Sequence, residues 1–575
     1  GIRDVLGSRG SEMCIRDREN REKEYLIPEG IVMKLGGVRE EQYLLTNRDK
    51  QNMMGKDRIC VVEGKGTLIF DFGKEYYGGV RIMLGCCEVN STAPNVGIRF
   101  GESLSECCAG LGEKNATNDH STRDMEVYMS SNSDMEWGNT GYRYIRIDFL
   151  EEGVYRINNI FGTFIHGKYP EAAFETDNET VNAILKMSAR TIFLNIQNYI
   201  WDGIKRDQHV WVGDLYPEVL GICYLYRDKG VIYDTLDLIL DTYALPCWFN
   251  GIPSYNIWFM LIVGICYRLT GKKNARYSKA VREIVRMFDE CTDEDGNFDF
   301  DRAGLPYWKA DFFDWLTYDY ASDSGQGVYY LLLYALADVA EKEIYGEETR
   351  EEARRLSLRL RRRKGAESQF KSVQALKILS GAANGQREAR MIKEGGAKGY
   401  SSFLSYPISL ALSGSGDTQA AFDNLVEYYG GMLKMGATTC WESFDVTWME
   451  NACKITEFPD KGKADIHGDR GMFCYQGFRN SLCHGWSCGF LPFFVEKVVG
   501  FRFTDAACTK IAFTPDLCGL TYIKAKIPTE KGMVQVEHRR INGTVCTKVV
   551  LPEGLECESE WIIRPMTSEK RAEVV

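Results

Sequence analysis

Between residues 58 and 166, apolar and polar side chains alternate in short runs that are separated by Gly, Asn and Ser. Examples are GTLIFDFG, GVRIMLGC, NVGIRFGES and YRYIRIDFL. A period of two residues is typical of strands that bury one face. The pattern predicts a β-sandwich over residues 21–168. A polar stretch at 102–134 is expected to be a long loop between strands, and such loops are either functional or mobile.

From about residue 170 the apolar positions recur with a period near 3.6, as Val181, Ile184 and Leu185 illustrate. Helices are predicted at 180–200, 230–245, 256–269, 277–290, 325–343, 347–364, 367–379, 403–412 and 418–435. Their loops carry aromatic and acidic residues. This succession predicts a toroid of helical hairpins over residues 169–492, with the acidic loops gathered at one end. Alternation returns after residue 490, so a second β-sandwich is predicted for 493–575.

Length and composition agree with a multidomain globular protein. A chain of 575 residues exceeds the roughly 250–300 residues that one hydrophobic core supports. Its 44% hydrophobic and 26% charged residues are ordinary for folded proteins. A net charge of −11 argues against a nucleic-acid partner, and the apolar runs are shorter than the ~20 residues that span a bilayer. We expect neither a nucleic-acid nor a membrane partner.

The 19 cysteines are scattered and show no zinc-site spacing. Without a visible signal peptide they are interpreted as reduced thiols of a cytoplasmic protein. Residues 1–20 lack an apolar stripe and a signal-peptide core, so we expect a non-native or disordered leader and a missing native N-terminus. The DIHGD string at 465–469 does not have a recognised ligand spacing, and neither a metal nor a cofactor is expected.

The densest group of chemically competent residues is DGIKRDQHVWVGDLYPE at 202–218. It places several carboxylates around one Arg and one Trp. Cleavage of a glycosidic bond needs one acid to protonate the leaving oxygen, another carboxylate to activate water, and an aromatic face for the sugar ring. The alternative is structural: these acids cap the next helix and pair with Lys205 and Arg206.

A second group, GATTCWESFDVTWMEN at 436–451, places Glu442 beside Trp441. Burial against an indole tunes the protonation of a carboxyl group, although an exposed Glu at a helix start is the alternative. His484 lies in SLCHGWSCG and could equally be a structural histidine. Trp258 in SYNIW and Trp315 in DFFDW are aromatic residues that could stack on a sugar or belong to the core. No P-loop, HExxH motif or nucleophile elbow competes with this interpretation.

Taken together in this order, these strings, with DFGKEYYGGV, RFGES and HGWS, resemble those of the bacterial α-L-rhamnosidases of glycoside hydrolase family 78 and their six-hairpin relatives, from about residue 71 to the C-terminus. The resemblance implies an (α/α)6 catalytic toroid flanked by N-terminal and C-terminal β-sandwich domains. It implies that Glu442 is the general base. It also implies that a set of further residues contacts the sugar: Asp202, Arg206, Trp211, Asp214, Trp258, Trp315 and His484. Trp441 is expected to line the same pocket, because an indole can cover the apolar face of a deoxy-sugar.

The chain departs from the family at the proton donor. The usual string is DCPQRDERLGWTGD, in which the Glu after Arg-Asp is the proposed general acid. Here the string is DGIKRDQHVWVGD, one residue shorter, with Gln208 at that position. We therefore predict Asp207, the nearest acid, as the replacement donor opposite Glu442, with Glu218 as the alternative.

Three functions remain open at this stage. The first is an inverting glycoside hydrolase that removes terminal α-L-rhamnosyl or similar deoxy-sugar residues. The second is a relative that has lost its acid and only binds carbohydrate. The third is a structural role in which the β-sandwiches form oligomer contacts, and a homodimer is left open.

Overall fold

The computed structural model describes residues 21–46, 57–305, 312–314, 325–363, 367–472, 475–558 and 563–565. The predicted leader at 1–20 and Trp315 lie outside these residues. The chain forms two compact units. The first contains the residues up to Gly101, Ser121–Tyr169 and Ile196–Tyr199, and the second contains Glu102–His120, Pro170–Asn195 and the chain from Ile200 onward.

The first unit is built on an eight-stranded sheet with the order β1-β8-β3-β7-β5-β6, in which β2 also pairs with β3 and β4 with β8. Its long central strand β3 (Cys60–Leu84) pairs antiparallel with β7 and parallel with β8. The other strands are β1 (Glu22–Leu26), β2 (Gly30–Arg39), β4 (Glu88–Val89), β5 (Asn95–Gly101), β6 (Asp124–Tyr128), β7 (Ser133–Phe149) and β8 (Gly153–His166). The predicted strands are confirmed, but a strict alternation is not: β3 and β8 bury long continuous runs, such as Leu68, Ile69 and Phe70, because they lie in the interior of the sheet.

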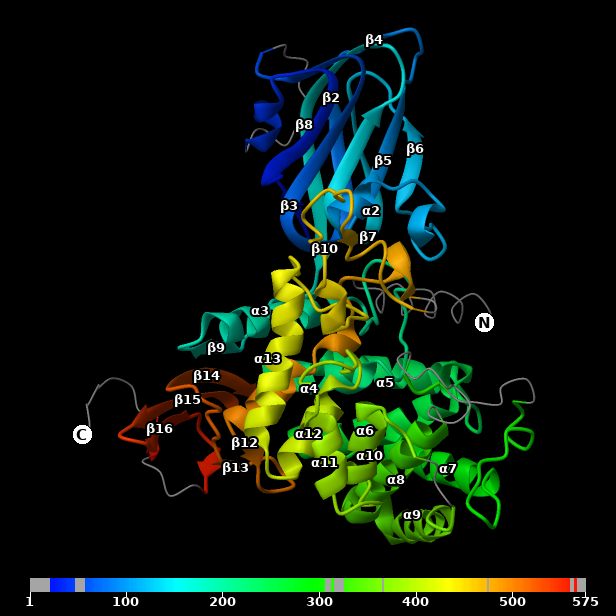
Figure 1. Cartoon of the computed structure of the whole chain (residues 1–575), viewed down its shortest axis with the longest axis vertical. Helices are drawn as coiled ribbons and strands as arrows, with labels where there is room; N and C mark the ends of the chain where they lie inside the picture. The colour runs from blue at the N-terminus through cyan, green and yellow to red at the C-terminus, as the bar shows by residue number, and fades with distance from the viewer. Residues whose placement is uncertain are drawn as a thin grey trace, which may run out of the picture. The chain divides into compact units, whose positions relative to one another are not determined.

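Helices dominate the second unit and are coloured from green to yellow in Figure 1. The nine predicted helices are confirmed with shifts of a few residues at their ends. They are α3 (Glu179–Asn195), α5 (Gly230–Thr242), α6 (Pro253–Thr270), α7 (Ala275–Glu290), α8 (Gly325–Glu341), α9 (Gly346–Leu360), α10 (Lys371–Leu379), α12 (Ser405–Gly414) and α13 (Thr418–Lys434). The pattern did not predict α2 (Leu104–Cys108), α4 (Leu215–Leu225), α11 (Gln386–Lys393) and α14 (Phe490–Phe493).

The missed helix α4 follows directly after the acidic loop and is buried along its whole length. A helix that is surrounded by protein on all sides shows no polar face, and hence no 3.6-residue period. Its burial fixes the position of the loop that precedes it. In contrast, α7 has a polar face and a buried face, so its period is plain in the sequence.

The same unit contains the C-terminal strands. A five-stranded sheet has the order β18-β16-β15-β14-β9, so β9 (Ala173–Thr176), which precedes the helices in sequence, completes the edge of a sheet made by the end of the chain. A three-stranded sheet has the order β12-β13-β17, and β10 pairs with β11. The bounds are β10 (Ala452–Cys453), β11 (Ala464–Asp465), β12 (Phe501–Phe503), β13 (Lys510–Phe513), β14 (Tyr522–Thr529), β15 (Gly532–Ile541), β16 (Thr544–Leu551), β17 (Glu556–Cys557) and β18 (Ile563–Pro565).

Two further observations bear on the sequence predictions. The cysteines in the described part of the chain are free thiols. Among the described helices, none combines the length and the apolar character that crossing a membrane requires.

Candidate active site

Three segments of the second unit lie side by side and carry the predicted site residues. Gly203 and His484 form an isolated β-bridge, and the backbone N–H of Gly485 donates to the carbonyl of Asp202 at 2.7 Å. The N–H of Glu442 donates to the carbonyl of Ser481 at 2.9 Å. Backbone hydrogen bonds therefore hold the loop at 202–214 and the segments around Glu442 and His484 together.

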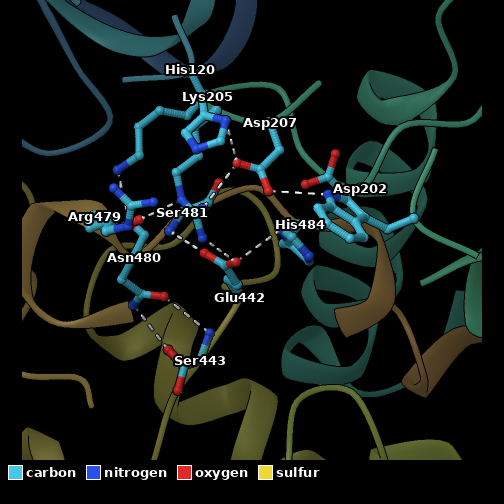
Figure 2. A network of polar contacts seen from close by, with 12 residues as sticks. His120, Asp202, Lys205, Asp207, Glu442, Ser443, Arg479, Asn480, Ser481 and His484 are labelled. Atoms are coloured by element: carbon cyan, nitrogen blue, oxygen red, sulfur yellow. Dashed lines mark hydrogen bonds and ion pairs between the residues drawn. The ribbon is translucent and has the colours of Figure 1, made fainter. Parts of the chain in front are cut away.

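The two predicted catalytic carboxylates, Asp207 and Glu442, lie in one polar network (Figure 2). The guanidinium group of Arg206 joins them. Its Nη1 lies 3.1 Å from Oδ1 of Asp207, and its Nη2 lies 2.7 Å from Oε1 of Glu442. The Nε–H donates to the carbonyl of Arg479 at 2.9 Å, and the ring of Tyr475 lies 5.4 Å from the guanidinium carbon. Because a guanidinium is planar and rigid, these contacts fix how the two carboxyl groups are oriented relative to each other.

Asp207 has two further partners. The indole Nε1 of Trp211 lies 3.1 Å from Oδ2, and Nδ1 of His120 lies 3.0 Å from Oδ1. The backbone reaches this position through two consecutive left-handed residues, Asp207 at φ 59° and Gln208 at φ 54°. Such a conformation is costly for residues other than Gly and persists only when surrounding contacts hold it.

The side chain of Gln208 turns back into its own loop. Its amide Nε2 donates to the carbonyl of Ile204 at 3.0 Å. The residue that stands where the resembling family has its acid is therefore an amide bonded to the loop backbone. It has no proton to give in acid catalysis.

His484 lies between two acids. Its Nε2 is 2.9 Å from Oδ1 of Asp214, and its Nδ1 is 3.7 Å from Oε1 of Glu442. Burial favours the neutral ring, but Glu442 and Asp214 outweigh burial and raise the pKa of His484 to about 9. The ring is therefore a cation at neutral pH and neutralises part of the acidic site. Tyr255 donates to Oδ2 of the same Asp214 at 3.4 Å.

Three buried acids of this region have raised pKa values: Asp202 and Asp214 interact with the histidine, and Glu218 lies against Gly485. Burial is the main cause that raises the pKa of Asp202, Asp214 and Glu218. Both carboxyl oxygens of Glu218 are buried and accept no hydrogen bond from the described residues. A Cβ on Gly485 would overlap with Oε1 of Glu218, so the carboxyl group lies directly against this glycine. Burial, with Asp214 and Asp202 nearby, thus favours the uncharged form of Glu218 behind the loop.

A second charged cluster lies beside Arg206. The Nζ of Lys205 is 2.9 Å from Oε2 of Glu102 and 3.2 Å from Oε1 of Glu106. It also donates to the carbonyls of Phe478 and Asn480 at 2.7 Å each. Burial disfavours the ammonium, but the two glutamates outweigh this effect and raise the pKa of Lys205.

The oxygens of these glutamates and a ring nitrogen of His467 lie within 4.8 Å of one another, a spacing that could hold a metal ion. The ammonium of Lys205 already supplies a cation at this cluster. Burial and Lys205 lower the pKa of His467 to about 4, so the imidazole adds no charge. The cluster is therefore charge-paired by the chain's own side chains.

The predicted indoles lie at different depths. Trp211 is half-buried. Trp258 is 1% exposed and packs against the rings of Tyr216 at 4.7 Å and Phe403 at 5.2 Å. Trp441, also 1% exposed, packs against Phe444 at 5.5 Å. Trp211 is therefore the one of the three described indoles with surface left for a sugar, and stacking by any of them stays a prediction.

Several residues of the site were not predicted. His120 and Glu102 come from the polar stretch at 102–134, which the sequence flagged only as functional or mobile, and the structure places residues 102–120 in the second unit. Trp486 donates from Nε1 to the carbonyl of Glu442 at 2.9 Å. Its position two residues after His484, a predicted site residue, is the feature of the sequence that could have identified it. Lys205 was predicted only as a structural partner of the acids.

Comparison with solved structures gives the fold of this chain. A GH78 family rhamnosidase of Bacillus sp. GL1 matches 92% of the chain with a TM-score of 0.68 at 18% sequence identity. A rhamnosidase from Klebsiella oxytoca with rhamnose bound matches 83% with a TM-score of 0.61 at 17% identity. An α-L-rhamnosidase of Streptomyces avermitilis complexed with L-rhamnose matches 85% with a TM-score of 0.63 at 14% identity.

The chain thus has a multidomain fold of helices and β-sheets that is shared with glycoside hydrolases. More narrowly, it has the fold of solved α-L-rhamnosidases, as the sequence resemblance predicts. The chain spans 57% of the length of the Bacillus protein, 48% of the Streptomyces protein and 96% of the Klebsiella protein. Neither the comparison with protein-family models nor that with curated proteins gives a match.

Proposed function

We propose that this protein is an inverting glycoside hydrolase that removes terminal α-L-rhamnosyl, or similar deoxy-sugar, residues from glycosides or oligosaccharides. The observation that carries the proposal is the arrangement of Asp207 and Glu442 on the two terminal nitrogens of Arg206. Two carboxylates across a bound sugar are the groups that hydrolysis of a glycosidic bond requires. The rhamnosidase fold supports the choice of sugar.

Glu442 is proposed as the general base. Its Oε2 accepts the backbone N–H of Ser481 at 2.8 Å and its Oε1 accepts from Nη2 of Arg206 at 2.7 Å, so two donors fix its orientation, and the His484 ring lies 3.7 Å from Oε1. In an inverting reaction this carboxylate takes the proton of the water that attacks the anomeric carbon. Asp207 is assigned to the opposite, acid side of the reaction.

The remaining residues are proposed to bind the sugar. Asp202, Asp214 and His484 present polar atoms beside Glu442, and Trp211 presents an indole that can cover the apolar face of a deoxy-sugar. The finer architecture also belongs to the proposal. It comprises an (α/α)6 toroid over 169–492 between β-sandwiches at 21–168 and 493–575. A cytoplasmic location and reduced thiols stay predictions as well.

A second function is favoured by one specific observation. Gln208 stands at the family's acid position and is bonded to the loop backbone. A chain with this substitution could bind rhamnose without cleaving a glycoside. The alternative is a carbohydrate-binding protein that keeps the fold and the sugar-binding side chains.

One experiment separates the two functions. Release of p-nitrophenol from p-nitrophenyl α-L-rhamnoside is measured for the parent and for Glu442→Gln, and L-rhamnose binding is measured by calorimetry for both. Hydrolysis that is lost in the variant supports the hydrolase. Binding of rhamnose without any hydrolysis by the parent supports the binding protein, and the absence of both would contradict each function.

A further inference from the structure

A series of side-chain contacts leads from the surface of the second unit to Glu442. His120 contacts Asp207 (Figure 2). Asp207 in turn contacts Arg206, and Arg206 contacts Glu442. The exposed fraction of these side chains falls in this order from 33% to 13%, 9% and 1%. The series therefore has one end that solvent reaches and one end that it does not.

This gradient matches the two sides of a terminal glycoside. The leaving group of a terminal sugar continues outward into the rest of the substrate, whereas the attacking water approaches the opposite face of the ring. The proton donor therefore belongs at the exposed end of the series and the base at the buried end. Glu442 occupies the buried end, and His120 occupies the exposed end.

The contacts of Asp207 limit its own role as a donor. Its oxygens face donors from Arg206, Trp211 and His120. Of these three side chains, neither the guanidinium nor the indole releases a proton under ordinary conditions, whereas an imidazole does. Among Arg206, Trp211 and His120, the side chain that can transfer a proton to a substrate is therefore that of His120.

We infer that His120 is a further catalytic residue, which donates the proton to the leaving-group oxygen, while Asp207 orients its ring. The inference rests on the proposed function and supplies the donor that Gln208 cannot provide. A carboxylate bonded to one imidazole nitrogen fixes the ring and leaves the other nitrogen for the substrate, as in the Asp–His pairs of hydrolases. Here Nδ1 faces Asp207 at 3.0 Å, and Nε2, which lies 3.6 Å from Oδ2 of Asp119 and so beyond hydrogen-bond distance, is the nitrogen assigned to the substrate.

Proton donation by His120 and attack by water together cleave the glycosidic bond. The Nε2–H of the protonated ring gives its proton to the glycosidic oxygen, and the bond between this oxygen and the anomeric carbon breaks with its electron pair going to the oxygen. Water forms the new bond to the anomeric carbon and passes one proton to Glu442. The alcohol and the inverted sugar leave. The proton on Glu442 is lost to solvent, and His120 regains one from solvent.

The surroundings of His120 fit this role. Its Nε2 is 3.6 Å from Oδ2 of Asp119, which is itself paired with Arg479. The ring therefore lies between two carboxylates, each of which also binds an arginine, Arg206 or Arg479. Glu218, the alternative donor predicted from the sequence, lies in the first turn of α4, is 1% exposed and packs against Gly485.

The test compares two leaving groups. A p-nitrophenolate departs without protonation, whereas an alkoxide needs a proton from the enzyme. We expect His120→Ala to lower kcat/KM for methyl α-L-rhamnoside by ~10²–10⁴-fold and for p-nitrophenyl α-L-rhamnoside by less than about tenfold. Added imidazole should restore part of the lost rate, and Asp207→Asn should show the same selectivity. The exposed His209, replaced by Ala, is the matched control and should leave both rates within about threefold of the parent.

The same measurements distinguish failure of the proposed function from failure of the inference about His120. A parent that hydrolyses neither rhamnoside would overturn the proposed function and the inference together. An active parent in which His120→Ala behaves like His209→Ala would overturn the inference alone. Equal losses on both substrates would also overturn it, because they would assign His120 to positioning and not to proton donation.

Discussion

Lys205 and Glu102 form a buried ion pair beside the candidate active site. Their atoms Nζ and Oε2 lie 2.9 Å apart, and neither side chain is more than 6% exposed. Glu102 also accepts the backbone N–H of Leu482 at 2.7 Å, in the segment that leads to His484. The pair therefore connects the loop that carries Arg206 with the segment that carries His484.

Loss of the ammonium should destabilise the fold. Lys205→Met leaves Glu102 and Glu106 buried without their cation, and we expect the free energy of unfolding in urea to fall by about 3–5 kcal/mol. Replacing Glu102 by Gln in the same variant removes one unpaired charge and should recover part of this loss. The exposed Lys463, replaced by Met, is the control and should change stability by less than about 0.5 kcal/mol. A similar effect of both lysine substitutions would contradict the buried pair.

The proposed base gives a second prediction. Glu442→Gln keeps the shape of the side chain and removes its negative charge, so kcat should fall by ~10²–10⁴-fold. Glu450 is an exposed glutamate in the same stretch, and Glu450→Gln should retain the parent rate. Activity of Glu442→Gln within threefold of the parent would exclude Glu442 as the base.

The two indoles Trp211 and Trp258 should respond differently to substitution. L-rhamnose is expected to quench tryptophan fluorescence, and this quenching should disappear in Trp211→Phe because Trp211 keeps an exposed surface. Trp258→Phe should retain the quenching and lower stability by about 1–3 kcal/mol, because its ring is enclosed by core aromatics. Loss of quenching in Trp258→Phe alone would assign the sugar contact to that residue. The same titration of Trp315→Ala would test the predicted contact of that residue.

The charge of His484 should make stability depend on pH. Its pKa of about 9 in the folded protein exceeds the ordinary value of 6.5, so its contribution is fully present below pH 6.5 and is lost as pH rises through about 9. The loss is on the order of 3 kcal/mol. The groups that face the ring are Asp214, Glu442 and Asp202.

Urea unfolding of the parent and of His484→Gln across this pH range measures the effect. The stability advantage of the parent over the variant should shrink as pH rises from 6.5 to about 9. Taking the difference in stability between the two proteins removes the pH dependence that comes from groups present in both. A difference that stays constant over the range would show that His484 is not charged in the folded protein.

The sequence predicted the elements whose surfaces alternate between core and solvent. The end of strand β7 and amphipathic helices such as α7 have this property, so their periods are visible, whereas β3 and β8 also bury continuous runs of residues. Helix α4 is buried along its whole length and shows no period, and α11 (Gln386–Lys393) is too short for one to be read reliably. The pairing of β9 with β14 joins residues that lie more than 340 positions apart, and no local pattern encodes such a contact.

The candidate site was predictable where its residues are close in sequence. Asp202, Arg206, Asp207 and Asp214 share one loop, and Glu442 stands beside an indole, so type and spacing pointed to them. The contacts of His120 with Asp207 and of Glu102 with Lys205 depend on tertiary structure. The sequence left open whether Trp258 stacks on a sugar or belongs to the core, and the structure encloses it while Trp211 keeps exposed surface.

The left-handed turn at Asp207 and Gln208 has a consequence for enzyme engineering. Restoring the family's glutamate by Gln208→Glu would point a carboxylate at the carbonyl of Ile204, which now accepts a hydrogen bond from the amide. Two acceptors would then face each other, and the new acid would have to swing away from a backbone that the turn holds in place. A gain of the lost carboxyl group therefore requires a longer loop together with the new side chain, so that the two changes are expected to be beneficial only in combination.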